Sequence, residues 1–484
     1  MTQYLYTMPA SSFLWYDFET FGQHPRQDRP SQFAAIRTDA ALNPIGEPMN
    51  WLCQPLPDLV PSPDACLITG LTPQHCAAYG IPEPEFAQRI LHAMSQPNTC
   101  SAGYNSIRFD DEVSRFLFYR NLLPVYDREW RDGNSRWDIL DVVRLTYALR
   151  PEGLNWPRKE DGSPSFRLED LSAANGLEHT QAHDALSDVR ATIGLAKAVR
   201  DAQPKLFDWA LKCRDKAFVK SQIPVLRRQP FVHVSGMIPA SQGCITVLLP
   251  LDFHPTNKNE IICFDLREDP AQLAGLTVDD IRHRLFTPTA ELGDTPRLAI
   301  KSVHANKCPM VAPISMFTEE LAERHGIDRA AMSRHAENLP PLNDILPRLH
   351  EALTRPPQES DAEQALYQGL IRDQDRDIVA AIHSTPDTEW PTLALPREPR
   401  LRTLLRRYIA RHSTQPLPAD IQQEWSRYLQ TALTREDVGS AMSLATATAR
   451  TETLLSEQPD HKVLKDVLNY LKQQQAVLDH LPLV

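Results

Sequence analysis

The sequence predicts an α/β domain at the N-terminus, followed by a β-rich segment and then by an all-helical segment. In the first part of the chain, strand-like runs alternate with amphipathic helical patterns, which is typical of a sheet covered by helices. Short β-rich runs separated by Gly, Asn and Pro follow, and the C-terminal part repeats apolar residues at helical spacing. At 484 residues the chain is too long for one core, so two or three domains are expected.

The elements of the α/β region can be assigned in order. A hydrophobic run from Phe13 to Tyr16 predicts the first strand, and Ser165 and Gly176 suit the start and the end of a later helix. The other expected elements are strands at 32–40 and 47–55, a Pro-rich loop at 55–73, a helix at 83–96, a short strand and helix within 99–123, and helices at 165–177 and 183–201.

The remaining elements change in character twice. Strands are expected at 230–236, 244–253 and 260–268, and amphipathic helices at 401–412, 421–433 and 460–481. Breaks in pattern fall at 201–208 and 353–364. We therefore expect three domains, at residues 1–202, 203–355 and 356–484.

Composition excludes some classes of protein and leaves others open. No apolar run approaches the ~20 residues of a membrane helix, and the N-terminus lacks the features of a signal peptide, so we expect a cytoplasmic protein. None of the eight cysteines lies at CxxC spacing, which favours reduced structural thiols over a zinc site or disulfides. The net charge of −11 argues mildly against a nucleic-acid partner but says little about local patches.

Two carboxylates stand at the end of the first strand. Side chains at i and i+2 of a strand face the same way, so Asp17 and Glu19 project together from one face. Their repulsion would be relieved by a divalent cation, and hard oxygen ligands favour magnesium or manganese over zinc. The alternative is that one acid is exposed while the other pairs with an arginine.

Further acids strengthen the metal interpretation. Asp110 and its neighbour Asp111 lie at a strand–helix boundary, where one of them is expected to cap the helix. His183 precedes the last helix of this region, Asp184 suits the N-cap, and Asp188 follows four residues later. Each has an ordinary structural explanation by itself, but together they indicate a catalytic centre.

These residues carry a family resemblance. An Asp-x-Glu strand, an aspartate after "YNSIRF" and a His-x4-Asp pattern resemble the DEDDh class of 3′–5′ exonucleases. The segments "ETFGQHPRQDRPSQFAAIRTD", "LITGLTP", "GYNSIRFDDEV", "YALRPEGLNWP" and "HVSGM" are similar to the bacterial exonuclease I family within that class. The resemblance implies a ribonuclease H-like mixed-sheet exonuclease domain, a small SH3-like domain and an all-α C-terminal domain.

The resemblance also implies the roles of the catalytic residues. Asp17, Glu19 and Asp188 would bind metal, Asp110 would complete the carboxylate set, and His183 would be the general base. Two Mg²⁺ ions are expected at the site, with Mn²⁺ as a substitute. Such a site hydrolyses phosphodiesters by activating water and stabilising the leaving oxygen.

Substrate and partner contacts are also expected outside the catalytic set. The side chains expected to meet single-stranded DNA are Thr20, Phe21, Ile68, Thr69, Arg115, Arg144 and Arg167. For each arginine, ion pairing or solvent exposure is an equal alternative. The resemblance further implies that Arg150 binds the acidic C-terminal tail of single-stranded DNA-binding protein, with a structural salt bridge as the alternative. We expect a monomer.

The sequence thus predicts a magnesium-dependent 3′–5′ exonuclease that degrades single-stranded DNA to 5′-mononucleotides in repair and recombination. A DEDDh exoribonuclease is the nearest alternative, although the three-domain length argues against it. A non-catalytic DNA-binding clamp is a second alternative, which the intact set of acids and His183 disfavours. An interaction protein that uses its C-terminal helices would leave the acids unexplained.

Overall fold

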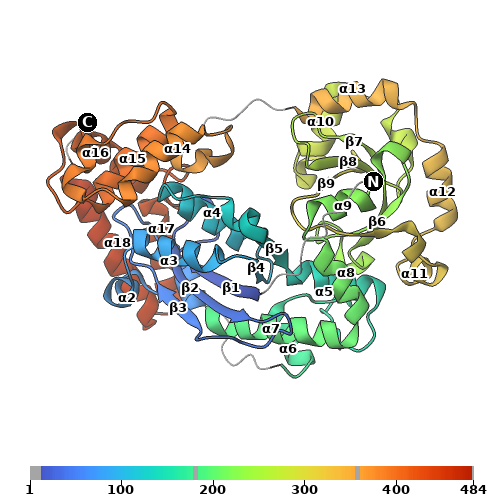
Figure 1. Cartoon of the computed structure of the whole chain (residues 1–484), viewed down its shortest axis with the longest axis horizontal. Helices are drawn as coiled ribbons and strands as arrows, with labels where there is room; N and C mark the ends of the chain where they lie inside the picture. Colours follow the sequence, from blue (N-terminus) through green and yellow to red (C-terminus); the bar gives the residue numbers. More distant parts are fainter. Residues whose placement is uncertain (1–11, 178–183, 355–359, 482–484) are drawn as a thin grey trace. The chain divides into compact units, whose positions relative to one another are not determined.

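A computed structural model of the chain describes residues 12–177, 184–354 and 360–481. The chain forms two compact units, each built from segments that are separated in the sequence (Figure 1). The described part of the first unit comprises residues 12–135, 184–190 and 360–481, and that of the second unit comprises 136–177 and 191–354. Among the described residues, no helix is both long and apolar enough to cross a bilayer.

The first unit contains a mixed sheet with the strand order β3-β2-β1-β4. Strand β1 (Ser12–Thr20) is antiparallel to β2 (Pro30–Thr38) and parallel to β4 (Thr99–Gly103). Strand β2 in turn is antiparallel to β3 (Met49–Leu52). The three expected strands up to residue 55 are therefore confirmed, and their register fixes which side chains share a face.

Two helices cover one face of this sheet, α3 (Glu83–Met94) and α4 (Asp110–Arg120). Phe18 on β1 packs on this face against Phe33 of β2 and Phe86 of α3, with the Phe18 and Phe33 ring centroids 5.0 Å apart. Because successive side chains of a strand point to opposite faces, Asp17 and Glu19 lie on the other face. The hydrophobic core therefore fixes the strand that carries the two acids.

The Pro-rich segment expected to be a loop at 55–73 instead contains a short helix, α1 (Pro63–Thr69), and a second, α2 (Pro73–Tyr79), begins at its last residue. Ser62 and Thr72 cap them, since their hydroxyls accept hydrogen bonds from the backbone N–H groups of Ala65 and His75. Each helix has a proline in its first turn, where no backbone donor is needed. Gly70, at φ +70°, ends α1. The prolines therefore start helices here.

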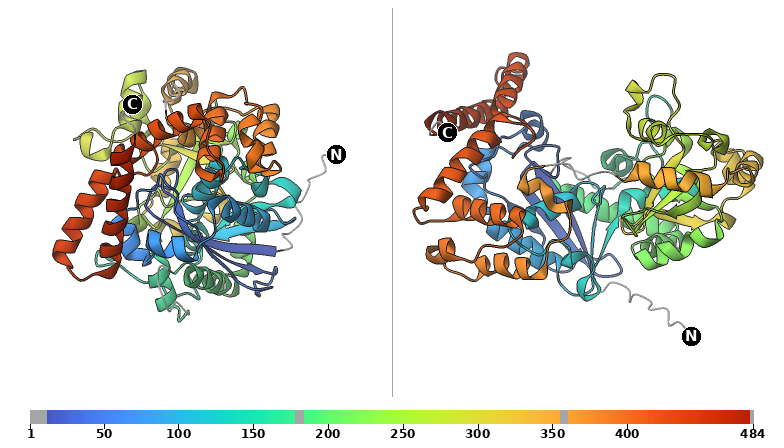
Figure 2. Two further views of the ribbon diagram at one scale, coloured as in Figure 1. Left: turned by 90° about the vertical axis from the view of Figure 1, so that its left-hand side faces the viewer. Right: turned by 90° about the horizontal axis from the view of Figure 1, so that it is seen from above.

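The C-terminal helices belong to the same unit. They are α14 (Asp373–Ala380), α15 (Pro399–His412), α16 (Ala419–Thr434), α17 (Leu444–Glu457) and α18 (Lys462–His480). Figure 2 shows α17 and α18 as an adjacent pair. Their buried side chains, with Leu433 of α16, share a core with Phe21, Leu59 and Cys66 from the N-terminal part of the chain. The expected helical segment is confirmed, and it shares a hydrophobic core with the N-terminal part of this unit.

A buried ion network also joins these two parts of the first unit. Arg29 donates to Asp58 at 2.7 Å and to Glu363, in the 3₁₀ turn Ala362–Tyr367, at 2.8 Å. Arg411 of α15 pairs with the same two acids, at 2.7 Å from Asp58. Tyr428 of α16 adds a hydrogen bond to Asp58. Two acids thus bridge two arginines, one from each end of the chain.

The second unit contains the β-rich segment. Its antiparallel sheet has the order β10-β6-β7-β8-β9, with β6 (Phe231–Val234), β7 (Ile245–Phe253), β8 (Glu260–Asp265), β9 (Ile300–His304) and β10 (Met310–Pro313). Strands were expected at the first three of these positions. The same segment also contains four helices not expected from the sequence, α10 (Val278–Phe286), α11 (Glu319–Arg324), α12 (Arg329–Glu337) and α13 (Leu342–Leu353).

The remaining helices complete the α/β region. They are α5 (Ile139–Leu149), which follows β5 (Ser135–Asp138), then α6 (Leu168–Ala174), α7 (Ala185–Ala202), α8 (Pro204–Lys212) and α9 (Lys216–Gln222). Gly176, at φ +64°, follows α6 as expected. Ser165 lies two residues before its N-cap, Arg167, and donates to Asp170. All eight cysteines are buried, and none forms a disulfide with another.

Candidate active site

Two acids of the candidate site come from β1. Asp17 and Glu19 are half-buried on the face opposite Tyr16 and Phe18, whose rings lie in the core. The alternation of β1 therefore turns both carboxylates toward the same region, as the sequence predicted.

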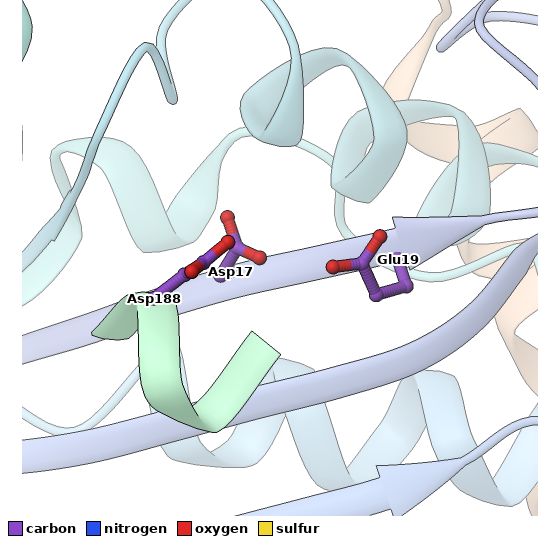
Figure 3. Close-up of side chains that lie close together, drawn as sticks. All are labelled: Asp17, Glu19 and Asp188. Carbon is purple, nitrogen blue, oxygen red and sulfur yellow. The ribbon is translucent and has the colours of Figure 1, made fainter. Parts of the chain in front are cut away.

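The third acid comes from the first turn of α7. Asp184 precedes the helix and accepts a hydrogen bond from the Ser187 N–H at 3.1 Å, so it caps α7 as expected. Asp188 lies one turn further and faces β1. Asp17, Glu19 and Asp188 each offer a carboxylate oxygen within 4.8 Å of the others, and Figure 3 shows these side chains gathered beside β1.

Burial and mutual repulsion disfavour the charged forms of these acids. Burial raises the pKa of Asp17 well above its usual value, and the charges of Asp110, Glu19 and Asp188 raise it further. The pKa of Glu19 rises to about 8, first through burial and then through Asp188 and Asp110. A divalent cation would relieve this repulsion, and three carboxylates form the oxygen donor set that Mg²⁺ or Mn²⁺ prefers. The residues present therefore fit a hard divalent metal.

Asp110 and Asp111 have different surroundings although they are neighbours. Asp110 accepts a hydrogen bond from the Phe18 N–H at 2.9 Å, and its charge acts on Asp17 and Glu19. Asp111 accepts hydrogen bonds from the Tyr16 hydroxyl and from Arg128, each at 2.7 Å. Asp110 thus lies beside the acid cluster, whereas Asp111 belongs to a buried structural network.

His183 lies outside the described residues, so its role as general base stays a prediction. The following residue, Asp184, is described, and its charge acts on both Asp17 and Glu19. Sequence reasoning gave Asp184 a capping role only. Its second, electrostatic role follows from the way in which α7 begins next to β1.

The residues expected to meet the terminal nucleotide differ in accessibility. Thr20 is buried and its hydroxyl donates to the Gly22 carbonyl, while Phe21 is only 1% exposed and belongs to the core shared with the C-terminal helices. Ile68 of α1 is 51% exposed. The Thr69 hydroxyl donates to the Ala65 carbonyl at 3.1 Å. A nucleotide can therefore reach the Ile68 side chain, whereas the Phe21 ring is not available for stacking.

The expected basic contacts also fall into two groups. Arg115 is buried and pairs with Glu129 at 2.7 Å and with Glu112 at 2.8 Å, so ion pairing accounts for it without a phosphate contact. Arg167 is exposed and lies 3.3 Å from Glu169. It remains a candidate phosphate contact.

Arg144 lies within α5, and Arg150 is the residue that follows its last turn. Arg144 pairs with Asp141 at 2.7 Å, and a side chain at Gly236 would come within 2.6 Å of its guanidinium carbon. A side chain at position 236 would therefore require the Arg144 guanidinium to move. Arg150 is half-buried and donates to the Leu149 carbonyl at 2.6 Å. Neither placement tests the expected DNA or protein contact.

Family comparisons cover nearly the whole chain. Residues 14–196 match the family described as "Exonuclease", residues 214–355 the "Exonuclease I SH3-like domain", and residues 360–474 the "Exonuclease I C-terminal domain". Together with the mixed sheet and the helical C-terminal segment, these matches confirm the expected fold class.

Individual relatives are similar over the same length. Exodeoxyribonuclease I of Haemophilus influenzae is 43% identical over 90% of this chain and 93% of its own, and that of Escherichia coli is 45% identical over 88% and 90%. Among solved structures, exonuclease I from Methylocaldum szegediense has a TM-score of 0.90 at 43% identity, covering 96% of this chain and 99% of its own. E. coli exonuclease I in complex with a dA16 oligonucleotide has a TM-score of 0.90 at 41% identity, covering 97% and 100%.

Proposed function

The chain belongs to the exodeoxyribonuclease I family, and from that premise we propose that it releases 5′-mononucleotides from the 3′ end of single-stranded DNA. Family membership makes it an exonuclease and hence a hydrolase. Support for the substrate comes from the E. coli relative, whose structure was solved with a dA16 oligonucleotide. We place the activity in DNA repair and recombination in the cytoplasm.

The observation that carries this proposal is the cluster of Asp17, Glu19 and Asp188, whose carboxylates approach within 4.8 Å despite their repulsion. We propose that these acids hold two Mg²⁺ ions, for which Mn²⁺ can substitute, and that Asp110 completes the set. When bound, such ions lower the pKa of the attacking water and stabilise charge on the scissile phosphate and the leaving 3′-oxygen.

The residues of the chain supply positioning and proton transfer. The packed strand β1 holds Asp17 and Glu19 in a fixed relation, and the Asp184 cap fixes the first turn of α7 that presents Asp188. His183 is proposed to take a proton from the attacking water, since a histidine with an ordinary pKa of ~6.5 is mostly neutral near physiological pH and can accept a proton.

The DNA contacts that we propose beyond the acid cluster do not depend on the base sequence of the DNA. Thr20, Ile68 and Thr69 would contact the terminal nucleotide, and Arg144 and Arg167 would contact phosphates. Phe21 can take part only through its backbone, because its ring is buried.

We also propose that the chain binds the acidic C-terminal tail of single-stranded DNA-binding protein and that Arg150 contacts this tail. We propose that the enzyme is a monomer. We propose that the boundaries between the three domains lie near residues 202 and 355 of the sequence. These positions are close to the limits of the matched family models at 196, 214, 355 and 360.

Matched oligonucleotides test the proposed function. The wild-type enzyme with Mg²⁺ should shorten 5′-labelled single-stranded DNA from its 3′ end and release 5′-mononucleotides, while RNA of the same sequence should be a poorer substrate. His183→Ala should lower the single-turnover rate by roughly 10²- to 10⁴-fold and leave DNA binding intact. Preferential cleavage of RNA would identify an exoribonuclease, and wild-type rates for His183→Ala would contradict its role as the base.

A further inference from the structure

The segment that follows Glu19 closes on a single buried carboxylate. Residues 21–29 connect β1 with β2, and we call them the β1–β2 loop. Asp28, near the end of this loop, is only 5% exposed. Its Oδ2 accepts a hydrogen bond from the His24 N–H at 2.8 Å, and its own N–H donates to the His24 carbonyl at the same distance. Asp28 therefore closes the loop through both its side chain and its backbone.

The Asp28 carboxylate also packs against the backbone at the start of the loop. A Cβ atom at Gly22 would lie 2.1 Å from Asp28 Oδ2 and 2.3 Å from the carboxyl carbon. Atoms that are not bonded do not approach so closely, so a side chain at position 22 would require the carboxylate to move. The Gly22 carbonyl accepts a hydrogen bond from the hydroxyl of Thr20, which follows Glu19 directly. Asp28 is thus connected through Gly22 with the residue next to Glu19.

The second oxygen of Asp28 binds the C-terminal helical segment. Residues 435–443 connect α16 with α17, and we call them the α16–α17 loop. Asp28 Oδ1 accepts a hydrogen bond from the Ala441 N–H of this loop at 3.0 Å. Beside it, the Gln27 amide donates to the Glu436 carbonyl at 2.9 Å. A carboxylate suits this position because each of its oxygens accepts a hydrogen bond from a backbone N–H.

Glu19 depends on this loop more than Asp17 does. The pairing of β1 with β2 is regular up to Glu19 and shifts register between Glu19 and Thr20. Asp17 lies two residues inside the regular part, whereas Glu19 lies at its end. Beyond the shift, the Phe21 N–H donates to the Arg29 carbonyl at 2.9 Å and joins the two ends of the loop. The backbone of Glu19 is therefore held by the sheet on one side and by the β1–β2 loop on the other.

We propose that Asp28 is a positioning residue for the metal site: it closes the β1–β2 loop, joins it to the α16–α17 loop and so holds Glu19 close to the other two acids of the cluster. The proposal rests on the proposed function, in which Glu19 binds metal. It also gives the C-terminal helical segment a part in metal binding, because the α16–α17 loop holds a loop that begins two residues after Glu19.

Metal binding in the absence of DNA tests the proposal directly. Free Mn²⁺ gives an electron paramagnetic resonance signal that is lost on binding, so titration of the full chain with Mn²⁺ gives a dissociation constant. Asp28→Asn keeps the shape of the side chain but turns an amide NH₂ toward a backbone N–H. It should weaken Mn²⁺ binding roughly tenfold, the lower end of the loss when groups that orient metal ligands are mutated. Equal affinities of Asp28→Asn and the wild type would overturn the proposal.

Gly22→Ala perturbs the same contact from the other side, because its methyl group would displace the Asp28 carboxylate. It should weaken Mn²⁺ binding as well, and it decides the matter if Asp28→Asn does not fold. Once the carboxylate is removed by Asp28→Ala, the methyl group at position 22 has room. The loss of affinity in the double variant should therefore be smaller than the product of the two single losses. Losses that multiply would contradict the proposed contact.

Asp375→Asn is the matched control. Asp375 of α14 is a buried carboxylate of the same unit, and it accepts a hydrogen bond from the Arg397 N–H at 2.6 Å, outside the β1–β2 loop. The control variant should lose stability but keep the wild-type affinity for Mn²⁺. Melting temperatures of all variants are measured, and the titrations are made where every variant is folded. A similar loss of Mn²⁺ affinity in Asp375→Asn would overturn the proposal, since any loss of stability would then suffice.

Kinetics on single-stranded DNA separates metal positioning from DNA binding. At low Mg²⁺, Asp28→Asn should lower kcat roughly tenfold, with KM for DNA within about twofold of the wild type, and excess Mg²⁺ should restore most of the rate. A rise in KM alone would indicate a DNA-binding role and overturn the proposal. If the wild-type enzyme bound Mn²⁺ but released no nucleotide, the proposed function would fail, whereas Mn²⁺ binding that depends on Asp28 would still support the positioning role.

Discussion

At the scale of single residues, the neighbouring acids Asp110 and Asp111 have different roles because successive positions of the helix α4 point in different directions. Asp110 accepts from the backbone of β1 and acts on Asp17, whereas Asp111 is held between Tyr16 and Arg128. A sequence reading cannot separate two adjacent aspartates by chemistry, and only the family resemblance favoured Asp110.

Replacing Asp188 by asparagine should remove a metal ligand while keeping the shape of the side chain. We expect kcat to fall by roughly 10²- to 10⁴-fold, because several kcal/mol of transition-state stabilisation depend on bound metal. The rise in melting temperature on addition of Mg²⁺ should also shrink. Asp201→Asn near the other end of α7 is the control, and equal Mg²⁺ responses in the two variants would contradict the assignment.

Local periodicity predicted the placement of some residues and not of others. Asp17, Phe18 and Glu19 alternate within one strand, so their two faces followed from the sequence. Arg115 did not, because it pairs with Glu129 and also donates to the hydroxyl of Tyr367 far along the chain. The side chain that satisfies an arginine depends on the tertiary fold, which spacing does not reveal.

At the scale of elements, α1 and α2 show why short helices are missed. A seven-residue helix offers too few turns for a periodic pattern, and the prolines at 63 and 73 resemble loop residues. The informative signals are the caps, since Ser62 and Thr72 each precede a proline at a helix start. Longer elements such as α3 and α18 repeat their pattern often enough to be predicted from it.

Thr72→Ala should destabilise α2 locally. Loss of the N-cap hydrogen bond to His75 costs about 0.5–2 kcal/mol, so amide hydrogen exchange in α2 should speed up by roughly 2- to 30-fold. The comparison is Thr318→Ala, which removes an equivalent cap from α11 in the second unit and should leave α2 unchanged. Unaltered exchange in Thr72→Ala would show that tertiary contacts alone hold α2.

At the scale of the whole molecule, two acids that bridge the ends of the chain differ in burial. Asp58 is buried between Arg29 and Arg411, whereas Asp64 pairs with Arg450 at the surface. Asp58→Asn should lower the free energy of unfolding by about 3–5 kcal/mol, because it leaves buried positive charge uncompensated. Asp64→Asn should cost at most about 1 kcal/mol. Urea unfolding of both variants measures the difference, and similar losses would contradict it.

The same network predicts loss of stability in acid. Burial alone would raise the pKa of Asp58, but Arg411 and Arg29 outweigh it and hold the pKa below its ordinary value; the pKa of Glu363 is lowered in the same way. A lowered pKa in the folded state stabilises the fold above the unfolded-state pKa of about 4, and this stability is lost as the pH falls further. The melting temperature should therefore drop steeply below pH 4, and less steeply in Asp58→Asn.

The packing of distant segments against each other was the feature of the molecule that was hardest to predict from the sequence. The breaks near 201–208 and 353–364 mark changes of composition, but local patterns do not show that residues 360–481 pack with residues 12–135. Arg29 and Glu363 are 334 residues apart, and Asp58 and Arg411 are 353 residues apart. Pairings of that separation follow from complementary buried charge and apolar surface, which become visible only in the folded chain.

That separation has a consequence for how the protein is made. The ribosome must add roughly 230 residues after residue 135 to reach Glu363 and roughly 275 to reach Arg411, which takes roughly 10 to 55 s at about 5–20 residues per second. During this interval Arg29 lacks Glu363, Asp58 lacks Arg411 and Tyr428, and the apolar surface around Phe21 lacks its cover. We therefore expect that surface to stay exposed in the nascent chain until residues 360–481 have been synthesised and can pack on it.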